Sequence, residues 1–502
     1  MIGRRAALVA AAAALILAGG ASAPVRAPLP LARATAADAP QSGEVRAKFG
    51  LAGRSGWVLI DLGSGEVLDA EAAEVNFAPA SVAKLPTALY ALDRLGPDHR
   101  FETRLMATGP VTGGHLAGDL VLVGGGDPEL DSDALADIVA EARAAGLRTV
   151  AGRFAVDAGL APTLPVIATD QPPEAPYNPA VSALNLNFNR VRLRWGQGTD
   201  KTPTLSAKST RADPRTDYVR AELEATSLIP FAHSVTRDGE TWRLDGRLFR
   251  GKGARWLPVR RPELYAGDVF RTLAAAAGLP LEAPEARAVP PAAEPLVRRA
   301  SRPLAEILRD MLDFSTNVTA EVVGRAAGGQ PAPTTLAGSA ARMNAWMAAR
   351  LDTRPGDPRI AFDNHSGLSV TSRAAPARIA ALLADAARAP MAGLAPHPRL
   401  PGPAAALLPS VNVAAASEPL DYDRLEIVAK TGTMDYIRGL AGYVATPGGR
   451  QWAFAIFSNH LAGRTGGTRQ IDRGWMAKAR GFERALIRSW VRRFDGETRA
   501  SR

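Results

Sequence analysis

The sequence predicts an α/β (α+β) fold in which both ends of the chain build one domain and the middle of the chain forms a β-rich insertion. Three observations support this prediction. A strand and a helix lie between residues 57 and 95, short alternating segments dominate from about 98 to 299, and helices followed by strands occupy the chain after residue 300. An insertion of about 200 residues is an ordinary size for a domain.

The N-terminal elements follow from local patterns. Residues 57–61 (WVLID) are typical of a short strand, and a glycine-rich turn sends the chain back along residues 66–68. A helix is expected over residues 81–95, because Gly96-Pro97 ends the helical pattern there.

The middle and the end of the chain differ in texture. Between 98 and 299, Gly, Pro and Asp turns separate strands expected at 120–123, 191–195 and 242–244, with one helical stretch at 133–145. After residue 300 the helical period returns. The expected helices are 303–312, 316–327, 337–351, 375–388 and 472–493, and the expected strands are 427–429, 439–444 and 452–458.

Composition limits the kinds of site that the chain can hold. None of its 502 residues is cysteine, which excludes disulfide scaffolds, thiolate zinc sites, iron–sulfur clusters and cysteine nucleophiles. Its six histidines lack the paired spacing of a metal site, so neither a metal nor another cofactor is expected. The net charge of +10 favours an anionic partner without choosing among cell-wall polymer, lipid headgroups and nucleic acid.

The first residues predict export. Arg4 and Arg5 precede an uncharged apolar run over residues 6–18, and small residues follow at 21–23. This is the layout of a secretory signal and is too short to span a bilayer comfortably. We expect residues 1–36 to be a signal peptide and linker and the protein to be periplasmic, with an uncleaved N-terminal anchor as the alternative.

The first chemical motif is Ser81-Val82-Ala83-Lys84. Residues three apart share one helix face, so the serine hydroxyl and the lysine amine can meet. A serine nucleophile needs a base, and a lysine can serve when burial or a second cation lowers its pKa. Taken alone, the pair fits a capping serine beside a surface lysine equally well.

Two further motifs follow along the chain. Ser315-Thr316-Asn317 opens a predicted helix, where ordinary helix caps would also fit. Lys430-Thr431-Gly432-Thr433 follows an apolar strand and can offer a backbone N–H to an oxyanion, a hydroxyl to a carboxylate and a cation beside both. Because only seven residues are lysine, Lys-Thr-Gly is the most specific of the three motifs.

Together and in this order, the motifs resemble those of the penicilloyl-serine transferases. Within that superfamily the chain is similar to the class C low-molecular-mass penicillin-binding proteins, which are D-alanyl-D-alanine carboxypeptidases and endopeptidases. A long gap between the first two motifs fits the inserted domains of that family. Four more segments support the narrower resemblance: 118–130 (GDLVLVGGGDPEL), 178–189 (NPAVSALNLNFN), 365–369 (HSGLS) and 433–443 (TMDYIRGLAGY).

The resemblance implies a domain plan. Residues 37–97 and 300–502 would form a penicillin-binding transpeptidase-like catalytic domain, an antiparallel sheet flanked by helices. Residues 98–299 would form the inserted β-rich domain or domains.

The resemblance also implies catalytic roles. Ser81 would be the acylated nucleophile and Lys84 its base. Ser315 and Asn317 would relay protons to the leaving group and orient the substrate amide. Lys430 would help to keep Lys84 neutral while it neutralises the substrate carboxylate.

Substrate binding would fall to the third motif and to one aspartate. Thr431, with Lys430, would hold the terminal carboxylate, and Gly432 separates it from Thr433, whose N–H would join that of Ser81 in an oxyanion hole. Asp157 matches a family position implicated in reading the free amino group of the peptide stem. An aspartate that opens a turn after a strand is the alternative interpretation.

Two positions depart from the family pattern. Thr316 stands where an aspartate is common, but its side chain is not required by this mechanism. His365 stands where the family more often has glycine, which leaves the geometry of the 365–369 loop undetermined.

These observations predict an exported serine DD-peptidase that cleaves D-Ala-D-Ala, and also D-Ala-meso-diaminopimelate cross-links, in peptidoglycan. Stem peptides would be its partners and β-lactams its covalent inhibitors, while nucleic acid is not expected. Arginine-rich tracts near 297–302 and 488–493 leave a peripheral contact with membrane or wall open. The alternatives are a β-lactamase, D-aminopeptidase or esterase with the same site, and a non-catalytic cell-wall binding protein.

Overall fold

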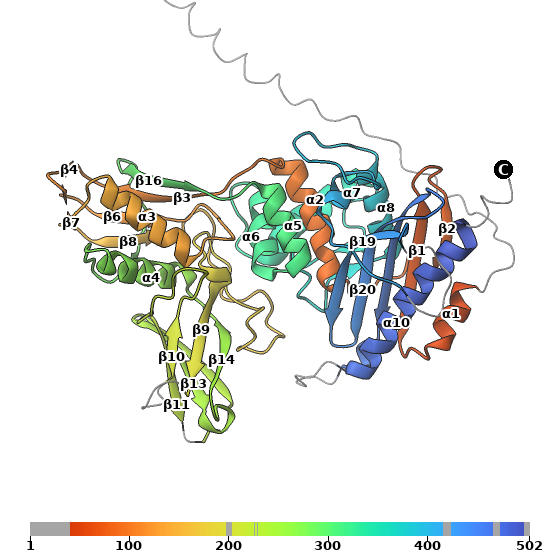
Figure 1. Ribbon diagram of the computed structural model, residues 1–502, viewed down its shortest axis with the longest axis horizontal. Helices are drawn as coiled ribbons and strands as arrows, with labels where there is room; N and C mark the ends of the chain where they lie inside the picture. The colour runs from red at the N-terminus through yellow and green to blue at the C-terminus, as the bar shows by residue number, and fades with distance from the viewer. Residues whose placement is uncertain are drawn as a thin grey trace, which may run out of the picture.

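The molecule is elongated, with a helix-flanked sheet at one end and a β-rich body at the other (Figure 1). Among the helices that are described, none is long and apolar enough to cross a membrane. The expected signal peptide at 1–36 lies outside the described residues. The computed structural model describes residues 41–196, 203–224, 226–227, 229–414, 423–464 and 472–495.

A five-stranded sheet brings the two ends of the chain together. Its order is β19-β20-β21-β1-β2, and every neighbouring pair is antiparallel. The pairing of β1 with β21 sets Trp57 opposite Ile456. This confirms the expected antiparallel sheet, whose strands are β1 (Arg54–Asp61), β2 (Val67–Glu71), β19 (Glu426–Met434), β20 (Ile437–Ala445) and β21 (Gln451–Asn459).

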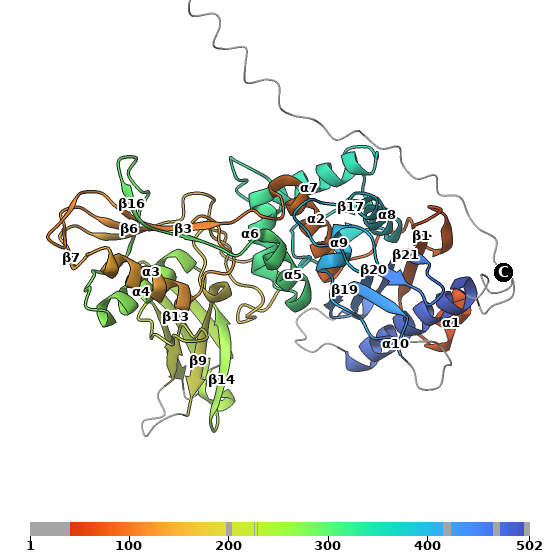
Figure 2. The same cartoon turned by 45° about the horizontal axis from the view of Figure 1, so that its top comes forward.

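Helices cover both faces of this sheet (Figure 2). Apolar side chains of α2 and α8 pack on one face, and those of α1 and α10 pack on the other. The remaining helices surround α2, which is buried over most of its length. These helices are α1 (Ser42–Lys48), α2 (Lys84–Leu95), α5 (Leu304–Phe314), α6 (Asn317–Ala327), α7 (Leu336–Arg350), α8 (Pro376–Ala387), α9 (Pro403–Leu407) and α10 (Arg473–Trp490).

Short elements complete this part of the molecule. The 3₁₀ turn η1 (Ala80–Ala83) leads into α2, η4 (Leu461–Gly463) follows β21, and a π turn η5 (Val491–Asp495) follows α10. A two-stranded ribbon pairs β17 (Ile360–Ala361) with β18 (Arg373–Ala374).

The β-rich body is built from residues between 102 and 300. Its largest sheet has the order β15-β8-β6-β3-β16, and three smaller sheets have the orders β10-β9-β14, β11-β13-β12 and β4-β5-β7. The strands of the largest sheet are β3 (Glu102–Ala107), β6 (Leu120–Val123), β8 (Phe154–Asp157), β15 (Glu285–Ala286) and β16 (Glu294–Ala300). The others are β4 (Val111–Thr112), β5 (His115–Leu116), β7 (Thr149–Val150), β9 (Arg190–Trp195), β10 (Thr204–Ser206), β11 (Val219–Glu224), β12 (Phe231–Thr236), β13 (Gly239–Asp245) and β14 (Gly253–Pro258).

Two helices and two 3₁₀ turns accompany these strands, and one of the helices is a correction. The predicted helix at 133–145 is α3 (Ser132–Ala144), but α4 (Pro262–Ala276) was not expected. α4 packs against both α3 and β8, and its charged residues Glu263 and Asp268 are buried together with its apolar ones, so its burial does not follow an apolar stripe with a solvent-exposed polar face. The turns are η2 (Asn187–Asn189) and η3 (Gly246–Leu248).

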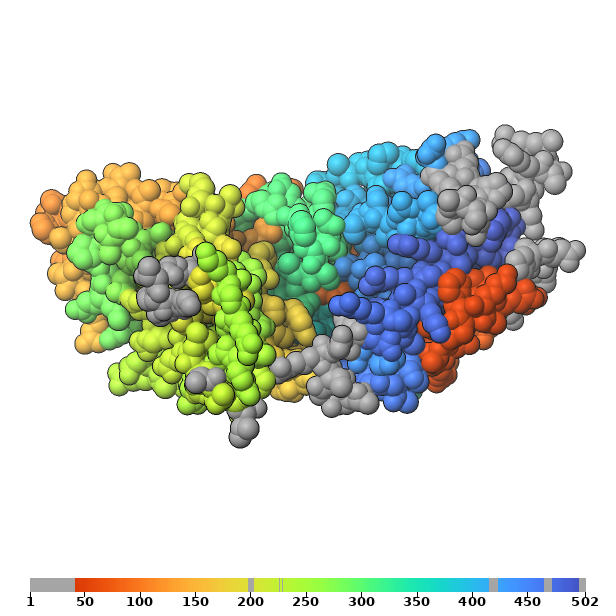
Figure 3. Space-filling view, turned by 60° about the horizontal axis from the view of Figure 1, so that its bottom comes forward, coloured from red at the N-terminus to blue at the C-terminus, as the bar shows by residue number. Residues whose placement is uncertain are grey.

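A loop from the β-rich body packs against the helices of the other body (Figures 1 and 3). Ile167, Ala168 and Val181 form one apolar cluster with Val318 and Val322 of α6. Arg325 donates to the Pro162 carbonyl at 2.9 Å, and Gln330 donates to the Leu160 carbonyl at 3.0 Å. The two bodies are therefore joined by side-chain packing beside α6, in addition to the two chain crossings.

Candidate active site

Ser81 and Lys84 lie where η1 becomes α2. Pro79 and the positive backbone φ of Ala80 (47°) turn the chain into this 3₁₀ segment, so the predicted helix starts as a tighter turn. Lys84 is completely buried, and its Nζ lies 3.1 Å from Ser81 Oγ. The first motif thus forms the predicted hydroxyl–amine contact.

Two further oxygen atoms surround the Lys84 amine. Its Nζ donates to Asn317 Oδ1 at 2.7 Å and to the Ser366 backbone carbonyl at 2.8 Å. Burial lowers the pKa of Lys84 well below its usual value, the charge of Lys430 lowers it further, and Glu321 opposes both effects. A lysine held largely neutral in this way can accept the proton of a serine hydroxyl.

The second motif sits at the junction of α5 and α6. Ser315 ends α5 with a left-handed backbone (φ 57°, ψ 39°), a conformation that a non-glycine residue adopts only where its surroundings impose it. Asn317 begins α6, and its Nδ2 donates to the Tyr177 carbonyl of the β-rich body at 2.9 Å. The side-chain amide of Asn317 therefore links the lysine base to the inserted segment.

The third motif lies inside β19, which is longer than the predicted strand. Burial, together with the charge of Arg438, lowers the pKa of Lys430 to about 8, and Asp313 opposes this shift. Asp313 lies near the end of α5, two residues before Ser315. This end of α5 is therefore close enough to Lys430 of β19 to affect its pKa. Asn317 of the second motif and Lys430 of the third therefore both lie near Lys84 of the first.

The edge position of β19 exposes backbone donors beside Ser81. Ala429 donates its N–H to the Pro409 carbonyl, away from β20, at 3.0 Å. Because N–H groups alternate in direction along a strand, those of Thr431 and Thr433 also point to this open side. A Cβ on Gly432 would lie 2.5 Å from the Pro79 carbonyl and 3.2 Å from the Ser81 nitrogen, so the strand runs directly against η1.

Sequence reasoning missed several groups that complete the site. Glu321 is fully buried on α6 and accepts the N–H groups of His365 (3.0 Å) and Ser366 (2.8 Å). It therefore braces the loop whose carbonyl binds Lys84. Its spacing of four residues from Asn317 on one helix was the available signal; the contacts of Tyr177 and Arg438 had no comparable local signal.

His365 is a core residue. It is fully buried, its Nε2 lies 2.8 Å from Ser339 Oγ, and a Cβ on Gly324 would touch its ring. Burial lowers the pKa of His365 to about 3, so the ring is neutral. The ring fills the space that the missing side chain of Gly324 leaves on α6.

Asp157 ends β8 in the β-rich body, and its carboxylate serves the local backbone. Oδ1 accepts the Gly159 N–H at 2.7 Å, and Oδ2 accepts the Val289 N–H at 2.7 Å. Among the described residues, no contact joins it to the serine–lysine group. A role in substrate recognition remains a prediction for Asp157, and its present contacts are those of a turn-forming aspartate.

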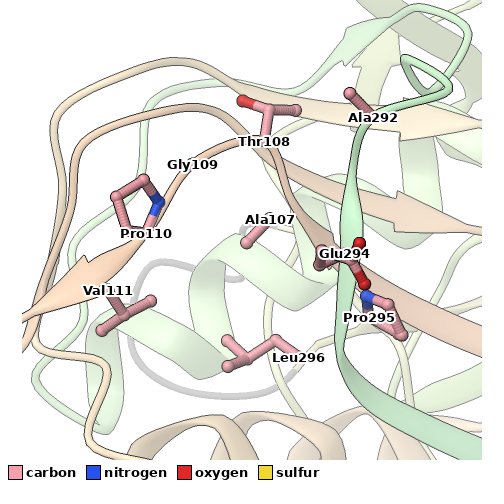
Figure 4. Close-up of a pocket in the computed structure, with 9 residues that line it drawn as sticks. All are labelled: Ala107, Thr108, Gly109, Pro110, Val111, Ala292, Glu294, Pro295 and Leu296. Atoms are coloured by element: carbon pink, nitrogen blue, oxygen red, sulfur yellow. The ribbon is translucent and has the colours of Figure 1, made fainter.

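A hollow in the β-rich body lies apart from the three motifs. An open hollow of about 320 Å³ lies between the end of β3 and the start of β16 (Figure 4), and its walls contain no motif residue. Within the described ranges, no group of three or more His, Cys, Asp or Glu side chains is arranged to hold a metal ion.

Comparisons with known proteins show the family of the chain. Residues 51–477 match the model of the D-Ala-D-Ala carboxypeptidase 3 (S13) family. The chain is 28% identical to a D-alanyl-D-alanine carboxypeptidase of Actinomadura sp. (strain R39) over 82% of this chain and 78% of that protein. It is 23% identical to the D-alanyl-D-alanine carboxypeptidase DacB of Haemophilus influenzae over 76% and 80% of the two chains.

Solved structures share the fold. The crystal structure of penicillin binding protein 4 (dacB) from Haemophilus influenzae superposes with a TM-score of 0.70 at 19% identity, over 90% of this chain and 99% of that one. The same protein in complex with a β-lactam superposes with a TM-score of 0.67.

Proposed function

This chain belongs to the D-Ala-D-Ala carboxypeptidase 3 (S13) family, and we propose that its DD-peptidase activity on peptidoglycan proceeds through an acyl-enzyme on Ser81. The observation that carries the proposal is the 3.1 Å contact of Ser81 Oγ with the buried amine of Lys84. Lys84 accepts the hydroxyl proton while Oγ attacks the carbonyl carbon of the penultimate D-alanine.

The oxyanion formed in this step needs donors that are already in place. The Thr433 N–H on the open edge of β19 and the N–H of Ser81 supply them. When the intermediate collapses, the C–N bond breaks and the leaving amine takes a proton from Lys84 through Ser315. Water then attacks the ester, returns a proton to Ser81 and releases the shortened peptide.

Lys430 binds the carboxylate of the leaving group, together with the hydroxyl groups of Thr431 and Thr433. A pKa near 8 keeps Lys430 mostly protonated at neutral pH, while burial and Lys430 itself keep Lys84 neutral. The site thus holds one cation for the substrate and one uncharged base for the serine.

The wider proposals concern domains, location and partners. Residues 37–97 and 300–502 form the catalytic domain and residues 98–299 the insertion, which is supported by the separation of their apolar cores. We propose a periplasmic location, with peptidoglycan stem peptides as substrates and β-lactams as covalent inhibitors; the comparison protein's β-lactam complex supports the last point.

Intact-mass measurement after exposure to benzylpenicillin tests the acyl-enzyme. We expect a stoichiometric adduct on the wild type and on the control Ser64→Ala, an exposed serine in the β1–β2 turn, but none on Ser81→Ala. The same three proteins are assayed for D-alanine release from an N-acyl-D-Ala-D-Ala peptide. Rapid drug hydrolysis without a lasting adduct would indicate a β-lactamase. If the protein neither forms an adduct nor hydrolyses the drug, the result would favour a non-catalytic wall-binding protein.

A further inference from the structure

A buried arginine stands beside the carboxylate-binding strand. Arg438 of β20 is only 7% exposed and lies directly opposite Thr433 of β19. Its Nη1 donates to Thr433 Oγ1 at 2.7 Å. The pair sits at a position of the ladder without backbone hydrogen bonds, where opposing side chains are closest.

Glu483 of α10 fixes this arginine from the other side. Both of its carboxylate oxygens accept from Arg438 Nε, at 3.0 and 2.9 Å, and Glu483 is 3% exposed. A buried guanidinium needs such a partner because an unpaired buried charge is strongly destabilising. A purely structural role, the attachment of α10 to the sheet, would explain the ion pair of Arg438 with Glu483. It would not explain why Arg438 Nη1 points to Thr433 of β19.

The bond to Thr433 has a chemical consequence. A hydroxyl oxygen that accepts from a cation keeps its own proton available, so Thr433 can donate to an anion at the edge of β19. The charge of Arg438 also reaches Lys430, which faces Lys84 of α2 and Asp313 of α5. Arg438 therefore acts on two groups that meet the substrate carboxylate.

We propose that Arg438, held by Glu483, is a positioning residue that makes the site selective for peptides whose leaving D-residue carries a free carboxylate next to the scissile amide. This inference rests on the proposed function. The C-terminal D-alanine and the D-centre of a cross-linking diamino acid both meet this description, whereas a C-terminal amide does not.

Substrate pairs test the proposal. The variants are Arg438→Met, Arg438→Lys and the double variant Arg438→Met/Glu483→Met. The double variant removes both buried charges, so it should stay folded even if Arg438→Met is destabilised by the unpaired Glu483. Arg350→Met is the matched control, because Arg350 binds Asp385 between α7 and α8 away from β19. Each protein is assayed with an N-acyl-D-Ala-D-Ala peptide and with its C-terminal amide.

We expect Arg438→Met and the double variant to raise KM for the free acid about 10-fold, because Arg438 no longer holds the Thr433 hydroxyl for its bond to the substrate carboxylate. KM for the amide and kcat should change little. The basic limb of kcat/KM should move to higher pH, because the pKa of Lys430 rises when the neighbouring cation is removed. In Arg438→Lys the basic limb should return to its wild-type position.

Three results would overturn the inference. Equal losses on the acid and the amide with an unmoved basic limb would assign Arg438 a structural role. A double variant that keeps the wild-type preference for the acid would do the same. A wild-type protein that cleaves neither peptide and forms no penicillin adduct would instead sink the proposed function, and the inference with it.

Discussion

Burial lowers the pKa of both lysines of the site, but by different amounts. Lys84 is completely buried and loses its proton readily because burial and Lys430 both disfavour its charge. Lys430 is also buried, but Asp313 supports its charge and its pKa settles near 8. Glu321 supports the charge of Lys84 in the same way, so the stronger lowering of the Lys84 pKa comes chiefly from burial rather than from which charges face each amine.

The first prediction concerns the pH dependence of this pair. The proposed mechanism needs neutral Lys84 and protonated Lys430, so kcat/KM should rise through the lowered pKa of Lys84 and fall as pH increases through about 8. In Lys430→Met the acidic limb should shift to higher pH, because the pKa of Lys84 rises when the neighbouring cation is removed.

Acylation by benzylpenicillin, measured between about pH 5 and 10, checks both limbs. Lys478→Met, which changes an exposed lysine of α10, serves as the control and should keep the wild-type profile. An acidic limb that stays in place in Lys430→Met would mean that the two lysines do not interact.

At the scale of elements, the site depends on how closely β19 approaches η1. Gly432 has no side chain at the point of contact, and its neighbours there are backbone atoms of Pro79 and Ser81 and the Cβ of Ala80. Backbone cannot rotate aside as a flexible side chain does, so this distance is set rigidly. The helix α6 contributes in the same way, since its first turns carry both Asn317 and Glu321 toward Lys84.

We therefore predict that Gly432→Ala slows acylation by about 100-fold, the cost of displacing reacting groups by roughly an ångström. The new methyl group would lie 2.5 Å from the Pro79 carbonyl and push the Thr433 N–H away from Ser81. The second-order rate constant with benzylpenicillin measures the effect, and thermal melting shows that the fold is retained.

Gly43→Ala in α1 is the matched control, because no atom lies within 4 Å of the added Cβ. It should acylate at the wild-type rate. A Gly432→Ala protein that acylates within about twofold of wild type would contradict the prediction. It would show that β19 can move away from η1 while the oxyanion donors stay in place.

At the scale of the whole molecule, the insertion takes part in the site. The Tyr177 carbonyl accepts from the same Asn317 side chain that binds Lys84. The loop that carries Tyr177 is anchored on α6 by an apolar cluster, in which Val181 is fully buried. The β-rich body thus contacts the Asn317 side chain, to which the proposed mechanism gives a catalytic role.

Loosening this anchor should slow the chemistry. Val181→Ala removes two buried methyl groups, a loss of about 2 kcal/mol at most, and should lower Tm by a few degrees. Acylation should slow about fivefold, as expected when a hydrogen bond worth about 1 kcal/mol is weakened at Asn317. The control Val235→Ala lies on β12 with its side chain 45% exposed and should acylate normally. If Val181→Ala and Val235→Ala are acylated at equal rates, the packing of the insertion on α6 does not affect catalysis.

Much of this protein follows from the sequence alone. The three motifs, their order and the fold class were predictable, because a spacing of three residues on a helix and an apolar strand before Lys-Thr-Gly are local patterns. The contact of Ser81 with Lys84 needs only one turn of chain. The helix α4 was not predicted, because tertiary packing buries its charged residues Glu263 and Asp268 as well as its apolar ones, and the usual division into a buried apolar face and an exposed polar face is lost.

Only the tertiary structure decided what surrounds those motifs. Asn317 and Ser366 bind Lys84 from more than 200 residues away, and Glu483 reaches Arg438 from another layer of the fold. It also decided that the Asp157 carboxylate binds local backbone. The physical reason is that burial and electrostatic shifts depend on distance through space, which local patterns in a chain do not record.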